Sequence, residues 1–103
     1  NVSINNTGID IQTQRDENVA VVFEGEVRVK AFVPGQNNVV IIKHGNYYTV
    51  YSKLKSVEVK QGQVLQTGDL VGKVYTNNAG ITQLHFEVWR DKKKLDPERW
   101  LKQ

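Results

Sequence analysis

The sequence predicts an all-β domain in which antiparallel sheets stack as a sandwich. Apolar and polar residues alternate with a period of two in several short runs, as in strands with one buried face. Glycines lie mostly between these runs, where tight turns would join consecutive strands. No long stretch carries the apolar repeat of about 3.6 residues that marks an amphipathic helix.

The first four expected strands differ in how clearly they are marked. Gly8–Thr13 and Val19–Phe23 are short runs with weak alternation, whereas Glu26–Ala31 alternates regularly between polar and apolar residues. Val39–Ile42 is a continuous apolar run, which is typical of a strand covered on both faces.

The later strands follow a hairpin signal. His44-Gly45-Asn46 has the residues of a tight turn, and the next run, Tyr47–Tyr51, is rich in β-branched and aromatic residues. Val57–Lys60 alternates again, and Leu70–Tyr75 and Leu84–Arg90 complete the set.

One short helical turn is expected near the C-terminus, at Asp96–Leu101. Asp96 would cap it and Pro97 would occupy its first position. The chain has 103 residues, which is the size of one domain, and no linker interrupts it. We therefore expect residues 1–103 to form a single domain.

Composition excludes several classes of function. The chain has no Cys, which removes thiol nucleophiles, Cys-ligated zinc and iron–sulfur clusters. The net charge is only +3, and the basic residues are spread along the chain rather than clustered with stacking aromatics. Its one basic run, Lys92-Lys93-Lys94, lies between Asp91 and Asp96 in an expected turn. A nucleic-acid partner is therefore not expected.

The spacing of glycines between Val57 and Gly72 is similar to that in lipoyl and biotinyl carrier domains. Those domains need a modifiable lysine at a hairpin tip, in a Met-Lys-Met or Asp-Lys-Ala context. This chain has no Met, and Lys53 and Lys73 lack such neighbours. The carrier interpretation is therefore not favoured.

Polar side chains that could carry chemistry lie on one expected strand face. Residues Gln83, His85 and Glu87 alternate with Leu84, Phe86 and Val88, so the first three share one face and the others enter the core. Asp10 begins an earlier strand. The second histidine, His44, opens a turn, and a structural or solvent-exposed role is expected for it.

Several short motifs follow one another in a characteristic order. They are Asn6-x-Gly8-Ile9-Asp10, Val39-Val40-Ile41-Ile42-Lys43-His44-Gly45, Tyr51-Ser52-Lys53-Leu54, the glycines Gly62, Gly68 and Gly72, Gln83-Leu84-His85-Phe86-Glu87, and Leu95-Asp96-Pro97 with Trp100. From about Asn6 to Trp100 the chain thus resembles the LytM/lysostaphin-type zinc metallopeptidase domain. The resemblance implies the barrel-sandwich hybrid fold of that family, a duplicated hybrid motif.

In active members of that family, zinc is held by a His-x-x-x-Asp pair and by the second His of a His-x-His. The first His of that pair, and another in a Tyr-Ala-His-Leu-like segment, serve the catalytic water and the oxyanion. Here Asn6, Lys53 and Gln83 replace three of these histidines, and only Asp10 and His85 match.

These replacements predict a degenerate site without catalysis. A catalytic zinc normally has three protein ligands, and Asp10 and His85 supply two. Lys53 is cationic and Gln83 cannot shuttle a proton. We therefore expect zinc to be lost, no cofactor to be bound, and Lys53 to pair with Asp10 in a vacated groove where the replaced positions converge.

Degenerate family members such as the LytM domains of the murein hydrolase activators EnvC and NlpD point to a function. The resemblance implies a periplasmic or envelope domain that activates a peptidoglycan amidase through its former substrate groove. Peptidoglycan itself, and an inner-membrane protein bound through an upstream region, are further expected partners. The chain is expected to be a fragment that lacks the N-terminal part of a longer protein. An active zinc metalloendopeptidase that cleaves peptidoglycan and a passive wall-binding module remain as alternatives.

Overall fold

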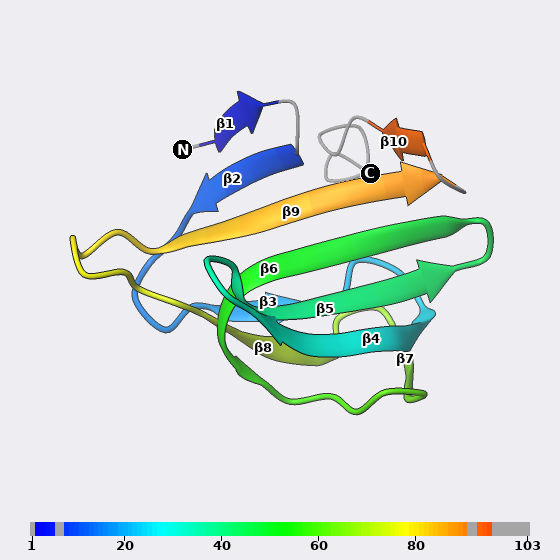
Figure 1. Cartoon of the computed structure of the whole chain (residues 1–103). Helices are drawn as coiled ribbons and strands as arrows, with labels where there is room; N and C mark the ends of the chain where they lie inside the picture. Colours follow the sequence, from blue (N-terminus) through cyan, green and yellow to red (C-terminus); the bar gives the residue numbers. More distant parts are fainter. Residues whose placement is uncertain (1, 6–7, 91–92, 96–103) are drawn as a thin grey trace.

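The computed structural model describes residues 2–5, 8–90 and 93–95, with side chains for residues 8–90, and these residues form ten strands without a helix (Figure 1). The strands are β1 (Val2–Asn5), β2 (Gly8–Gln12), β3 (Asn18–Ala20), β4 (Gly25–Val33), β5 (Asn37–His44), β6 (Tyr47–Val57), β7 (Val64–Leu65), β8 (Leu70–Val74), β9 (Gln83–Arg90) and β10 (Lys93–Leu95). None of the described residues belongs to a helix that is long and apolar enough to span a bilayer.

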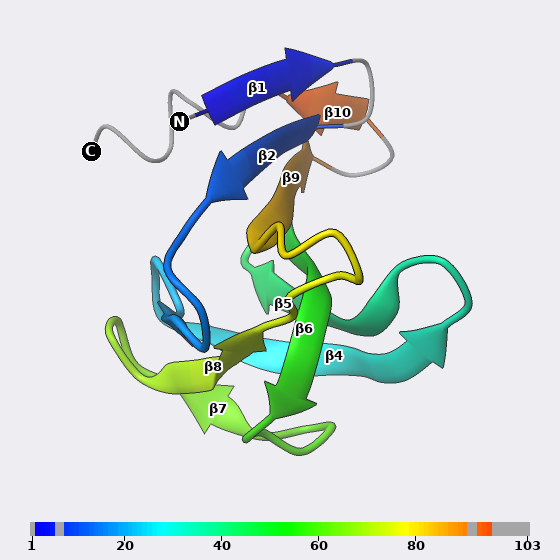
Figure 2. The same cartoon turned by 90° about the vertical axis from the view of Figure 1, so that its left-hand side faces the viewer.

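Every strand pairing among these elements is antiparallel. The main path runs β1-β2-β9-β6-β5-β4-β7, with β10 added to β9. β6 pairs with β5 and β9 over most of its length and with β8 at its C-terminal end, and β8 in turn pairs with β3. In Figure 2, β1, β2 and β10 lie at one end of the molecule and β7 and β8 at the other.

The apolar side chains of both layers meet in one core. They come from β2, β3, β4, β5, β6, β7, β8 and β9 and from the connecting loops. The largest fully buried side chains are Tyr51, Phe86, Ile9, Ile42, Leu54 and Leu65. Tyr51 and Phe86 pack with ring centroids 5.2 Å apart. This arrangement confirms the all-β prediction with stacked antiparallel sheets.

The predicted hairpin between β5 and β6 is present. His44 pairs with Tyr47 across a turn made by Gly45 and Asn46, and Gly45 has φ 64°. Glycine adopts this conformation at little cost, so the turn can match the twist of the two strands.

One predicted strand is wrong in its extent. Of Val57–Lys60, only Val57 belongs to a strand, and the chain then leaves the sheet. Val59 is nevertheless in the core, and Glu58 donates its backbone N–H to Val71 O at 2.8 Å. The alternation in Val57–Lys60 therefore reflects the burial of Val59, although this segment does not pair with a neighbouring strand beyond Val57. The turn predicted at Asp96–Leu101 lies outside the described residues.

The run Val39–Ile42 was predicted to be covered on both faces, and one of its residues is not. Val39, Val40 and Ile42 are buried, whereas Ile41 is only partly covered and faces an open trough. The short strand β7 and the pairing of β10 with β9 were not expected from the sequence, because strands of two or three residues carry little periodicity.

The histidine at the end of β5 has a structural role. Its Nδ1 lies 2.9 Å from Glu24 O and its Nε2 lies 2.7 Å from Thr49 Oγ1, so the half-buried ring joins β5, β6 and the loop before β4. Burial lowers the pKa of His44 below its ordinary value of 6.5, although hydrogen bonds from the ring to backbone carbonyls oppose this shift.

Stability should consequently depend on pH through His44. The unfolded chain binds the proton more readily than the folded one, so the stabilisation present above pH 6.5 is lost as pH falls through the lowered pKa. We expect the free energy of unfolding in urea to be smaller at pH 5.5 than at pH 7.5. The pH difference should shrink in His44→Gln, in which every other titratable group is retained. An equal difference in both proteins would contradict this assignment.

Candidate functional site

The pairing of β2 with β9 places two sequence-predicted residues opposite each other. Asp10 is the cross-strand partner of His85, and Gln12 is the partner of Gln83. Leu84, Phe86 and Val88 enter the core as expected, so the intervening residues of β9 lie on the other face of the sheet.

His85 is held between two carboxylates. Its Nδ1 lies 2.8 Å from Asp10 Oδ1, and its Nε2 lies 2.7 Å from Glu87 Oε2. Trp89 Nε1 donates to the second oxygen of Glu87, at 2.8 Å. A neutral imidazole donates at one nitrogen only, whereas the imidazolium form can donate to both carboxylates. The result is a continuous chain of contacts from Asp10 to Trp89.

Lys53 extends this chain at its other end. Lys53 Nζ lies 3.9 Å from Asp10 Oδ1, an ion pair longer than a hydrogen bond, with 33% of the Lys53 side chain and 18% of the Asp10 side chain exposed. Lys53 has φ 63°, its N–H donates to Gln36 O at 2.7 Å, and its carbonyl accepts from Tyr75 N–H at 2.9 Å. Backbone bonds on both sides thus fix an uncommon conformation.

Gly8 allows β2 to approach β9 beside this histidine. A Cβ at this position would lie 2.5 Å from Phe86 O and 2.6 Å from Glu87 Cγ, and the residue has φ 125°. Any side chain here would force Glu87 or the backbone of β9 to move. The glycine is therefore a requirement of the contacts between Asp10, His85 and Glu87.

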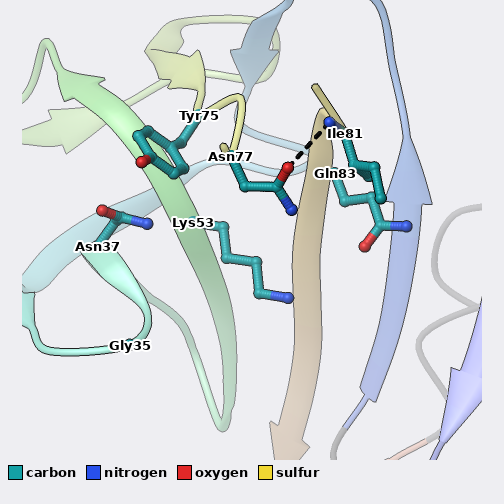
Figure 3. A pocket seen from close by; sticks show the side chains of 7 residues that line it. All are labelled: Gly35, Asn37, Lys53, Tyr75, Asn77, Ile81 and Gln83. Atoms are coloured by element: carbon teal, nitrogen blue, oxygen red, sulfur yellow. Dashed lines mark hydrogen bonds between the residues drawn. The ribbon is translucent and has the colours of Figure 1, made fainter. Parts of the chain in front are cut away.

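A polar pocket of about 180 Å³ opens beside Lys53 (Figure 3). We call this the polar pocket, and it is lined by Gly35, Asn37, Lys53, Tyr75, Asn77, Ile81 and Gln83. It therefore contains two of the site residues expected from the sequence, Lys53 and Gln83.

A second, larger hollow of about 440 Å³ lies on the same face of the sheet, across β4, β5, β6 and β9. We call it the apolar trough, because most of its surface is hydrocarbon. Its lining residues are Arg28, Val29, Ile41, Tyr48, Val50, Glu87 and Trp89. Glu87, which also contacts His85, connects the trough to the chain of contacts that begins at Lys53.

The described residues do not fit a catalytic zinc ion. Asp10 and Glu87 contact opposite nitrogens of the His85 ring, so a single ion cannot reach all three. The Lys53 ammonium adds positive charge beside Asp10. Within residues 8–90, no group of three or more His, Cys, Asp or Glu side chains could hold a metal.

The structure thus brings Asp10, Lys53, Gln83 and His85 to one face, and Asn6 lies outside the described residues. Sequence reasoning missed Asn37, Tyr75 and Asn77 as pocket residues, because they come from loops or strand ends without periodicity. A turn signal at Pro34-Gly35 was the one available hint of the loop before Asn37.

Comparison with known proteins gives the same family as the sequence motifs. The model of peptidase family M23 matches residues 4–97. The chain belongs to this family.

The relatives carry the names of activators and lipoproteins. The chain is 31% identical over 98 residues to the lipoprotein NlpD/LppB homolog of Pseudomonas aeruginosa, covering 93% of this chain and 33% of that protein. It is 28% identical over 100 residues to the murein hydrolase activator NlpD of Escherichia coli, covering 95% and 26% respectively. The chain thus spans about a third or less of the length of these relatives.

A solved structure with a different description is equally similar. A zinc containing peptidase from Vibrio cholerae superposes with a TM-score of 0.79 at 30% identity, over 86% of this chain and 28% of that one. This chain therefore shares its fold with part of a protein that is described as a zinc containing peptidase.

Restoring the family histidines tests whether the replaced positions still converge. We expect the triple variant Asn6→His, Lys53→His, Gln83→His to bind zinc more tightly than the native chain by orders of magnitude, because it regains a third ligand beside Asp10 and His85. Metal titration by calorimetry measures this, and the native chain should retain far less than one equivalent.

The matched control replaces the same three residues by Ala. It removes Lys53 without adding a ligand and should bind no more zinc than the native chain. A folded triple-histidine variant that fails to bind zinc would show that the backbone of the groove has departed from family geometry.

Proposed function

We propose that this chain is a non-catalytic domain of the cell envelope that activates an N-acetylmuramoyl-L-alanine amidase. The amidase docks in the groove that runs from the polar pocket past Asp10 and His85 to the apolar trough. Substitution of three family histidines removes the metal chemistry and leaves this concave face available for a protein partner.

The observation that carries the proposal is the chain of contacts from Lys53 through Asp10 and His85 to Glu87. Each carboxylate is paired with a side chain of this domain, and Lys53 places a positive charge 3.9 Å from Asp10. Such an arrangement forms a preorganised polar surface, whereas a metal-dependent hydrolase needs an open coordination position for water.

The apolar trough supports a protein partner. Hydrophobic side chains that lie open across four strands are typical of interaction sites, and Glu87, which lines the trough, contacts His85. Relatives named murein hydrolase activators and lipoproteins fit an amidase partner and a periplasmic location. Peptidoglycan, and an inner-membrane protein reached through an upstream region, are further proposed partners.

An active zinc metalloendopeptidase is the second candidate. It is favoured by the 30% identity to the zinc containing peptidase from Vibrio cholerae. Under that hypothesis, Asp10 and His85 would need a third ligand from outside residues 8–90.

A zymogram with purified cell wall separates these functions. We expect no clearing by the chain alone and clearing when it is combined with an amidase from the same organism, because activation requires both proteins. Clearing by the chain alone, abolished by a chelator, would establish the peptidase instead. Pelleting with cell wall, without clearing in either reaction, would indicate the passive binding module.

The trough should contribute to activation. Val29 lines it and is 39% exposed, so Val29→Asp would place a charge on the docking surface with little effect on the core. We expect amidase activation at a fixed domain concentration to fall by about tenfold or more, the change that corresponds to about 1.4 kcal/mol of binding free energy. Val64 is the matched control, because it is 63% exposed on the neighbouring strand β7 and does not line the trough. Val64→Asp should activate like the native chain, and equal activation by both variants would exclude the trough as a docking surface.

A further inference from the structure

The polar pocket carries an unusual excess of hydrogen-bond donors. Among the described residues, Lys53 Nζ has one ionic contact, with Asp10, and no hydrogen bond. Within the same part of the chain, the side-chain amides of Asn37 and Gln83 form no hydrogen bond either. These groups line one pocket together with Asn77 (Figure 3).

Asn77 is oriented by its own loop. Its Oδ1 accepts the backbone N–H groups of Ala79 and Ile81, at 2.9 and 3.0 Å. The acceptor of this amide is therefore occupied, and its Nδ2 donor lies on the side of Lys53 and Gln83 in Figure 3. The pocket thus presents one ammonium and three amide groups, and a ligand rich in acceptors would satisfy them.

We propose that the polar pocket binds a carboxylate, namely an Asp or Glu side chain of the amidase that docks in the groove. This assignment rests on the proposed function and adds the chemistry of the contact. A carboxylate accepts hydrogen bonds at both oxygens and pairs with the ammonium of Lys53, and charge-assisted hydrogen bonds of this kind are stronger than neutral ones.

Lys53 is prepared for this contact before the partner arrives. Its backbone is fixed in the left-handed conformation by hydrogen bonds to Gln36 and from Tyr75. Asp10 holds the ammonium at 3.9 Å, but the nearest oxygen of Asp10 already bonds to His85 at 2.8 Å. The donors of Lys53 thus remain available for a partner.

The neighbouring trough points to a protein side chain as the source of the carboxylate. Lys53 contacts Asp10, Asp10 contacts His85, and His85 contacts Glu87, which lines the trough. A single partner segment with one acidic residue and a stripe of apolar residues would therefore engage both hollows. The pocket volume of about 180 Å³ suits the end of one side chain.

Sodium acetate is a direct probe of the pocket, and it requires no amidase. We expect the side-chain amide NMR signals of Asn37, Asn77 and Gln83 to shift saturably with acetate, with an affinity on the order of millimolar for so small a ligand. Sodium chloride at equal ionic strength and the neutral analogue acetamide should produce no such shifts. Absence of saturable shifts with acetate would overturn the proposal.

Two lysines two positions apart on β6 give a matched pair of variants. Lys53→Met should abolish the acetate-induced shifts, because it removes the ammonium while retaining most of the hydrocarbon chain. Lys55→Met should retain them, since Lys55 is an exposed cation that pairs with Asp16 at 2.9 Å and does not line this pocket. Shifts that persist in folded Lys53→Met would overturn the assignment.

The amidase assay then tests the source of the carboxylate. Lys53→Glu should lower activation by about tenfold or more, while Lys55→Glu leaves it unchanged and both melting temperatures stay near the native value. If acetate binds but the native chain activates no amidase, the proposed function is refuted, and so is an amidase side chain as the ligand of the pocket. The carboxylate-binding site itself would still stand. Activation by the native chain with equal activation by Lys53→Glu would refute the occupant while the proposed function stands.

Discussion

The register between β2 and β9 is the constraint on which the candidate site depends. It sets Ile9 opposite Phe86 in the core and Asp10 opposite His85 on the other face. A shift by one residue would exchange these faces, because side chains alternate along a strand, and would bury Asp10 while exposing Ile9. The buried apolar pair therefore fixes the polar pair. Gly8 adds the close approach of the two strands that a larger residue would prevent.

The same pairing explains why a lysine is compatible with position 53, where the family resemblance would lead one to expect a histidine. Asp10 and Glu87 bring two negative charges to the buried His85, and Lys53 contributes a positive charge at 3.9 Å from Asp10. Removing one member of a buried charge pair is usually more costly than replacing both, since an unpaired charge remains. Lys53 is partly exposed and its contact with Asp10 is long, so the ammonium balances the local charge with only a small effect on the stability of the fold.

The sequence was sufficient to predict most of the sheet and the two faces of β9, because alternation in Leu84, Phe86 and Val88 directly reflects burial. It failed for Val57–Lys60, where Val59 is buried by a loop without a strand ladder. The polar pocket could not be derived, since Asn37 and Asn77 lie far apart in sequence and are brought to Lys53 by loop conformations that lack a periodic signal. The family motifs identified the candidate residues, whereas the contacts between their side chains could be found only in the three-dimensional structure.

The two hollows of the groove would contribute differently to recognition. Burial of hydrocarbon in the trough contributes roughly 25 cal/mol for each Å² removed from water, and it accepts many apolar shapes. The polar pocket is more selective, because a partner that covers Lys53 and the neighbouring amides without offering acceptors leaves desolvated donors unpaired. Affinity would therefore come mainly from the face formed by Val29, Ile41 and Val50, and discrimination from the end formed by Lys53 and Gln83. On the proposed function, Lys53 and Gln83 would select the ligand through charge and hydrogen bonding, not through catalysis.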